Sequence, residues 1–170
     1  MTLQNIVIGR GIQNYSCASP DSIPIALGAI ATLFDITTLA KLVPGAIIDT
    51  LPAAVELTHP LRTWEVNHAA SHQIFGHHYF DAVGTPIFNL SSVGKVFFGK
   101  KTAGVKAPIT ANIGPAGTGA VDWLQLRNKG GSIGVSEAYR VVTVGGNSLA
   151  TCIAAEVMRI PYVAEYWFYN

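Results

Sequence analysis

The chain has 170 residues, of which 49% are hydrophobic and only 12% are charged, and its net charge is +1. This length suits one domain that buries its own core, and the apolar stretches fall short of the ~20 residues that cross a bilayer. The 11 basic and 10 acidic residues are spread along the chain, which argues against a face for nucleic acid or for an anionic membrane.

The first segments along the chain predict strands. Residues 4–16 alternate apolar and polar positions, and Gly9 and Gly11 interrupt the pattern, which indicates a strand with a bulge or bend. Residues 25–34 have the length and composition of a second strand.

The next part of the chain departs from this pattern. Asp35 is placed to cap a short helix over residues 36–43, which Pro44 and Gly45 would end. We therefore expect a short helical or irregular insertion at about 36–75.

From residue 76 onward, runs rich in β-branched and aromatic residues alternate with Gly, Pro, Asn and Asp turns. The predicted strands are 77–80, 86–90, 94–99, 101–106, 121–126, 138–144 and 162–169. This spacing predicts a mainly β fold, an antiparallel β-barrel or β-sandwich, in a single domain over residues 1–170. Residues 113–120, rich in Gly and Pro, are predicted as a loop.

The last of these strands is almost wholly apolar or aromatic, which predicts burial on both of its faces. Glu165 within it needs a partner, because an unpaired buried charge costs several kcal/mol. Arg140 is the candidate partner that the sequence offers.

The two cysteines, Cys17 and Cys152, lie near opposite ends of the chain. A disulfide between them fits an oxidising compartment, and two unrelated buried thiols are the alternative. The first eight residues do not resemble a signal peptide, so we expect a secreted protein whose signal has been removed. Asn14 and Asn89 stand in glycosylation sequons, which fits secretion.

Seven segments together resemble the domain of unknown function 3455 family. They are Gly11-x-Gln13-Asn14-Tyr15-x-Cys17-Ala18, Ala31-Thr32-Leu33-Phe34-Asp35, Gly76-x-His78-Tyr79-Phe80, Trp123-Leu124-x-Leu126, Tyr139-Arg140-Val141-x-Thr143-x-Gly145-Gly146, Cys152 and Pro161-Tyr162-x-Ala164-Glu165-Tyr166-Trp167-Phe168-Tyr169. The resemblance covers nearly the whole chain. It implies a small exported protein of the kind found in filamentous fungi and bacteria, with Cys17 and Cys152 at the family's paired positions, but it implies no mechanism.

All histidines fall in one stretch, at His59, His68, His72, His77 and His78. His68 and His72 would share one face of a helix and are weak candidates for a metal site. Ala69 stands where a zincin needs glutamate, so we expect no metal and no other cofactor.

His78 matches the Gly-x-His-Tyr-Phe pattern of the family. It could form a ligand pocket with Tyr79, Arg140 and Glu165, a set of titratable groups suited to a small polar ligand. The alternative is a core histidine beside a buried ion pair.

The sequence motifs give little support for hydrolysis by a serine nucleophile, for dinucleotide binding or for sugar binding. The chain has no Gly-x-Ser-x-Gly elbow and no dinucleotide-binding fingerprint. Trp64, Trp123 and Trp167 could stack on a sugar, although aromatic residues on strands are more often core.

The sequence therefore favours a secreted, non-catalytic protein that binds a small molecule, a carbohydrate or a protein partner, including a host partner. One alternative is a metal-binding or hydrolytic enzyme that uses His78 and its neighbours. Another is a structural surface protein that self-associates as a homo-oligomer through exposed apolar edges.

Overall fold

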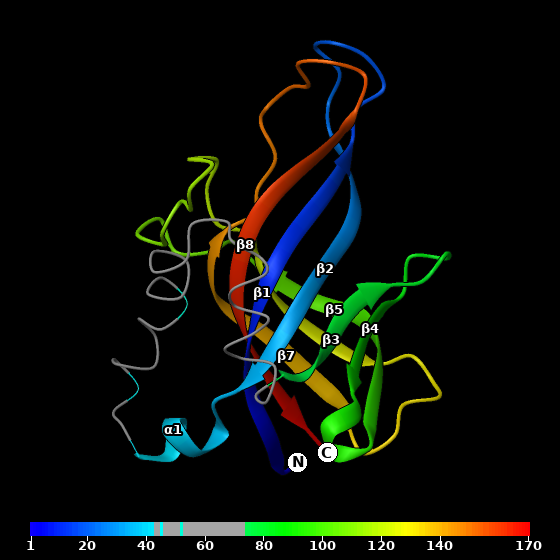
Figure 1. The fold of residues 1–170 in the computed structure, drawn as a ribbon, viewed down its shortest axis with the longest axis vertical. Coiled ribbons are helices and arrows are strands. Elements are labelled where there is room, and N and C mark those ends of the chain that lie inside the picture. The colour runs from blue at the N-terminus through cyan, green and yellow to red at the C-terminus, as the bar shows by residue number, and fades with distance from the viewer. Residues whose placement is uncertain (43–44, 46–51, 53–73) are drawn as a thin grey trace.

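The computed structural model describes residues 1–42, 45, 52 and 74–170. In these ranges the chain forms a closed antiparallel barrel in which each strand pairs with the next and the last strand closes on the first (Figure 1). The strands are β1 (Leu3–Ser16), β2 (Ile25–Asp35), β3 (Ile74–Phe80), β4 (Pro86–Leu90), β5 (Lys95–Val105), β6 (Trp123–Asn128), β7 (Glu137–Gly145) and β8 (Val157–Tyr169). The predicted mainly β fold is confirmed, and it takes the barrel form.

Alternate residues of the strands point into the barrel and fill it. On β8, Tyr162 and Tyr166 belong to the interior core, whereas Val163 and Glu165 between them face outward, and all four are fully buried. The interior core consists of Val7, Ala29, Ala31, Leu33, Phe75, Phe88, Leu90, Phe97, Leu126, Val135, Ala138, Tyr162, Ala164, Tyr166 and Phe168. The apolar sequence of β8 thus follows from burial on both of its faces.

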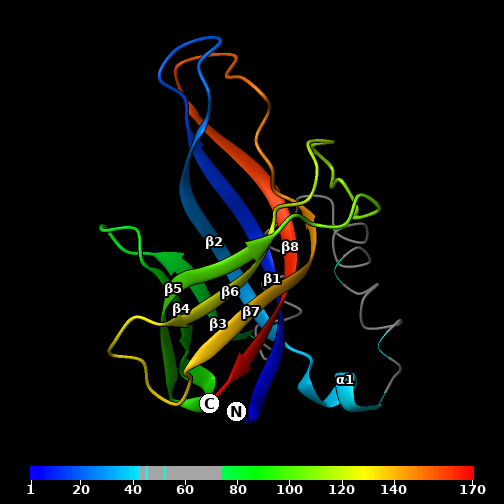
Figure 2. The same ribbon diagram turned by 180° about the vertical axis from the view of Figure 1, so that it is seen from behind.

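Three strands extend beyond the barrel as a separate ribbon. Pairing of β2 with β3 begins only at Ala31, and pairing of β8 with β7 ends at Tyr162, so the distal parts of β2 and β8 pair only with β1. Figures 1 and 2 show this extension rising above the barrel. Pro161 is tolerated in β8 because it lies just past the end of β7, where a missing N–H breaks no ladder with that strand.

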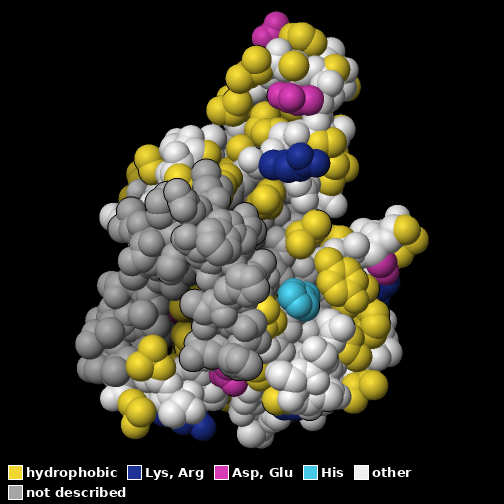
Figure 3. Space-filling model, viewed as in Figure 1, with side chains coloured by type: hydrophobic (Ala, Val, Ile, Leu, Met, Phe, Trp, Pro, Cys, Tyr) yellow, Lys and Arg dark blue, Asp and Glu magenta, His cyan; other side chains and the backbone are white. Residues whose placement is uncertain are grey.

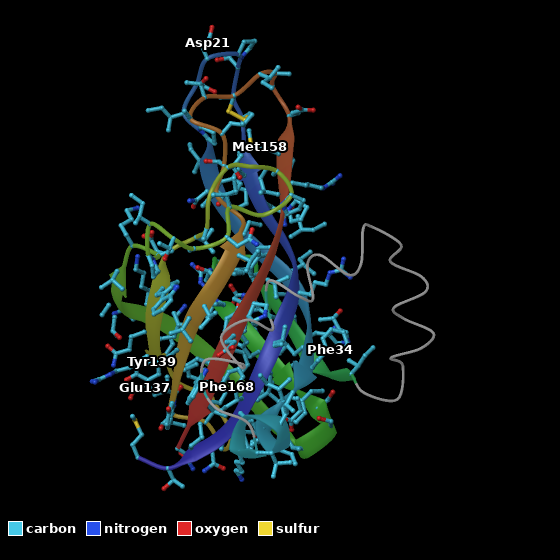
Figure 4. All side chains as sticks on the ribbon, turned by 90° about the vertical axis from the view of Figure 1, so that its left-hand side faces the viewer. Asp21, Phe34, Glu137, Tyr139, Met158 and Phe168 are labelled. Atoms are coloured by element: carbon cyan, nitrogen blue, oxygen red, sulfur yellow. A yellow bond between two sulfur atoms is a disulfide. The ribbon has the colours of Figure 1, made fainter. Side chains whose placement is uncertain are left out.

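The disulfide between Cys17 and Cys152 is present and lies at the far end of this extension (Figure 4). Both cysteines are buried, and backbone hydrogen bonds tie the two loops together, from Cys17 N to Glu156 O and from Cys152 N to Ser22 O. The bridge therefore links the β1–β2 loop to the segment that leads into β8.

The structure differs from the sequence prediction in β1 and β5. The register irregularities of β1 lie at Leu3/Asn5 and Asn14/Tyr15 rather than at its glycines. Gly11 instead permits close approach of β2, since a Cβ there would lie 1.9 Å from Ile30 O. The segments predicted as separate strands 94–99 and 101–106 form the single strand β5, because pairing with β6 continues through Lys100.

The helix predicted after β2 is confirmed as α1 (Thr37–Leu42), and Asp35 Oδ1 accepts a hydrogen bond from Thr37 N at 2.7 Å. The rest of the predicted insertion up to residue 73, apart from residues 45 and 52, lies outside the described residues. No helix in the described ranges is long and apolar enough to cross a membrane.

Candidate binding pocket inside the barrel

A half-open cavity of about 740 Å³ extends from the solvent-exposed Lys100 and Lys129 to the buried Phe88 and Tyr166 of the barrel interior. Residues of β3, β4, β5, β6, β7 and β8 line it. Its apolar wall consists of Phe80, Pro86, Phe88, Leu124, Leu126 and Tyr166. An adjoining cavity of about 380 Å³ reaches under the three-stranded extension and is lined in part by Gln13 and Tyr15 of β1. Phe80, Leu124, Lys101 and Arg140 line both cavities, so the two adjoin at these side chains.

Arg140 on β7 places a positive charge at the junction of the two cavities. Its Nε and Nη2 donate hydrogen bonds to the backbone oxygen of Asp122, at 3.1 and 2.8 Å. In the described part of the chain no carboxylate lies within ion-pair distance of the guanidinium, and the Asp122 carboxylate pairs instead with Lys106. The positive charge of Arg140 is therefore partly buried without an anion from the described residues.

The strand that carries Arg140 is irregular next to it. The register between β7 and β8 shifts between Val141 and Val144, and Val142 has a φ of 46°, which is strained for a β-branched residue. The bulge places Val141 and Val142 together on the outer face. Bulges of this kind re-aim side chains and are frequent beside functional sites.

His78 on β3 is buried in the pocket wall and is neutral at physiological pH. The pKa of His78 is lowered from 6.5 to about 4, mainly by burial; the hydrogen bond with Ile87 O raises it and the charge of Arg140 lowers it. The ring stacks on Phe88 at 4.0 Å, and Nδ1 lies 2.9 Å from Ile87 O. With Nδ1–H donating to that carbonyl, Nε2 carries the lone pair.

Two tyrosines of β8 belong to the interior core, and one of them, Tyr166, lines the larger cavity together with Arg140. The hydroxyls of Tyr162 and Tyr166 lie 3.1 Å apart, and burial raises the pKa of both phenols, so both stay protonated. The charge of Arg140 lowers the pKa of each, and Arg140 lies directly opposite Tyr166 in the pairing of β7 with β8. The polar side chains beneath Arg140 are therefore neutral.

Gln13 supplies a free hydrogen-bond donor to the same space. Its side chain is 8% exposed and lines the cavity under the extension. Its Nε2 is buried and has no hydrogen-bond partner among the residues that the structure describes. Buried donors are nearly always paired, so this exception indicates a missing acceptor.

The structure brings together two of the four predicted pocket residues. His78 and Arg140 line the same cavity. Tyr79 points away from it and is 39% exposed on the outside of the barrel. Glu165 also faces outward, where its Oε2 accepts a hydrogen bond from Trp167 Nε1. The predicted pairing of Arg140 with Glu165 does not form, because the two side chains lie on opposite faces of the barrel wall.

A groove of about 480 Å³ on the outer face of β6, β7 and β8 contains Trp123, Tyr139, Trp167 and Tyr169. Two of the predicted stacking tryptophans meet here, and Trp64 lies outside the described residues. Figure 4 shows Tyr139 and Glu137 side by side on β7, and the Tyr139 hydroxyl donates to Glu137 at 2.7 Å.

The predicted metal candidates His68 and His72 fall outside the described residues, as does His59. Among the residues that the structure does describe, no three His, Cys, Asp or Glu side chains are grouped to hold a metal. The two sequon residues, Asn14 and Asn89, lie half-buried within β1 and β4 rather than in loops.

Gln13, Lys101 and Tyr166 line the cavities but were not predicted as pocket residues from the sequence. The period-2 alternation of the strands carried a signal for two of them, because Gln13 shares a face with Tyr15 and Tyr166 shares one with the buried Tyr162. Which face points inward becomes clear only once the barrel closes.

The model of the family described as "Protein of unknown function (DUF3455)" matches residues 1–170 of the chain. No curated protein and no solved structure matches it.

Proposed function

The chain belongs to the DUF3455 family, and we propose that it is a non-catalytic binding protein that holds a small amphipathic organic molecule inside its barrel. The main observation that supports this proposal is the cavity of about 740 Å³, whose apolar wall surrounds a few convergent polar groups. This size and composition are typical of small-molecule sites, and closed barrels of eight strands can hold one such ligand.

The chemistry of the lining favours binding over catalysis. Among the described residues that line the main cavity there is no carboxylate and no cysteine. The pKa of His78, at about 4, makes it a weak base at neutral pH, and the buried tyrosines hold their protons. These groups can orient a ligand but are poorly placed to activate one.

The disulfide supports the further proposal that the protein acts outside the cytosol. A bridge between residues 17 and 152 persists in an oxidising compartment. In that setting the barrel would take up its ligand from the surroundings of the cell.

The neutral fluorophore N-phenyl-1-naphthylamine tests the binding proposal. We expect saturable fluorescence enhancement at one site per chain. The variant Leu124→Trp fills the junction of the two cavities and should weaken binding at least tenfold, because Leu124 lines both. The control Val105→Trp adds the same bulk on the neighbouring strand at a position that is 64% exposed, and should bind as wild type does. Absent or unsaturable enhancement, or equal binding by both variants, would refute an interior site.

A further inference from the structure

Resting on the proposed binding function, we infer that the ligand is a carboxylate with an apolar tail, and that its head group binds Arg140 and Gln13. The guanidinium of Arg140 donates to a backbone carbonyl and meets neutral tyrosines, while no carboxylate of the described residues pairs with it. A partly buried charge without a counter-ion favours an anion supplied from outside the protein.

Gln13 is the second, independent observation. Its buried Nε2 has no acceptor in the described part of the chain, and both Gln13 and Arg140 line the cavity under the extension. A carboxylate offers two oxygens with several lone pairs, so one group can accept from the planar guanidinium and from the amide. The geometry therefore places the head group between β1 and β7.

The residues around the opening of the cavities carry positive charge, as Arg140 does. Lys101 lines both cavities, and Lys100 and Lys129 line the larger one. The carboxylate in the lining of the smaller cavity is that of Asp122, which lies 3.2 Å from Lys106 Nζ. An excess of cations at the opening draws in anions and repels cationic amphiphiles.

The tail of the ligand would follow the apolar wall from this junction. Phe80 and Leu124 continue from the smaller cavity into the larger one, where Phe88 and Leu126 follow. Each buried methylene should tighten binding by roughly fourfold until the wall is covered. A medium-chain alkanoate satisfies both the charged and the apolar requirement.

Calorimetric titration with dodecanoate and 1-dodecanol at pH 7.5 tests this assignment, because the two differ in the head group. We expect dodecanoate to bind at least tenfold tighter. Arg140→Met should remove that preference and keep dodecanol binding, whereas Arg127→Met, on the outer face of β6 and 64% exposed in its side chain, should keep the preference. Gln13→Glu sets a negative charge beside Arg140 and should weaken dodecanoate selectively, so the test stands even if Arg140→Met fails to fold.

The outcomes separate the two proposals. Equal affinity of the wild type for both ligands, or a preference that survives Arg140→Met or Gln13→Glu, overturns the carboxylate assignment and leaves a neutral-ligand pocket. Binding of neither dodecanoate nor dodecanol overturns the assignment together with the proposed function.

Discussion

At the scale of single residues, burial sets the protonation state of the pocket. Desolvation disfavours charged forms, so the pKa of His78 falls and the pKa values of Tyr162 and Tyr166 rise. All three side chains are therefore neutral near pH 7, and Arg140 is the charge that they surround.

The lowered pKa of His78 makes the stability of the fold depend on pH. A histidine whose folded pKa is depressed stabilises the fold fully above its unfolded value of 6.5, and this stability is lost as pH falls toward about 4. We expect the free energy of unfolding to fall by about 2 kcal/mol between pH 7.5 and pH 5, measured by urea denaturation. His78→Phe should abolish most of this dependence.

Two comparisons separate the contribution of His78 to this pH dependence from that of other titratable groups. His77→Phe changes the exposed histidine next in sequence and should keep the full pH dependence. The carboxyl groups of Asp81 and Glu137, whose pKa values are lowered mainly by hydrogen bonds from Thr85 and Gln125, lose their contribution only at lower pH. A slope between pH 7.5 and 5 that is the same in His78→Phe and wild type would refute a buried neutral histidine.

At the scale of elements, the bulge in β7 stores strain next to Arg140. Val142 has a positive φ, which costs about 1–3 kcal/mol for a residue with a Cβ and nothing for glycine. The free energy of unfolding of the Val142→Gly variant should therefore exceed that of the Val141→Gly variant by at least about 1 kcal/mol. Val141 is the matched control because it is the neighbouring valine on the same face. Thermal and urea unfolding measure this difference, and a Val142→Gly variant no more stable than Val141→Gly would contradict the strained bulge.

Most strands could be predicted from sequence because their alternation and turn residues are local signals. The predicted segment 86–90 coincides with β4. The start of β8 was missed, since Pro161 reads as a strand breaker unless the end of β7 is known. The division of β5 into two strands at Lys100 was wrong for a related reason, because the pairing with β6 that continues through this residue is not visible in the sequence.

The site was less predictable than the strands. His78 and Arg140 could be proposed as pocket residues from their motifs, but their faces depend on the register between strands far apart in sequence. Glu165 lies opposite Val141 and not opposite Arg140, so a shift of one residue separates the two charges onto different sides of the wall.

At the scale of the whole molecule, different interactions stabilise the barrel and its three-stranded extension. The barrel is closed by pairing of β8 with β1 and contains the interior core. The extension consists of strands that pair only with each other, and Figure 3 shows apolar side chains on its surface. The Cys17–Cys152 bridge spans 135 residues and stabilises the fold by up to about 5 kcal/mol in the chain-entropy model.

Mapping dodecanoate binding by ¹H–¹⁵N chemical-shift perturbation tests most directly whether a ligand enters the barrel. We predict the largest changes at His78, Arg140 and Tyr166, with little change at the indole N–H groups of Trp123 and Trp167 in the outer groove. Perturbations concentrated on those two indoles, or none at saturating dodecanoate, would contradict an interior binding site.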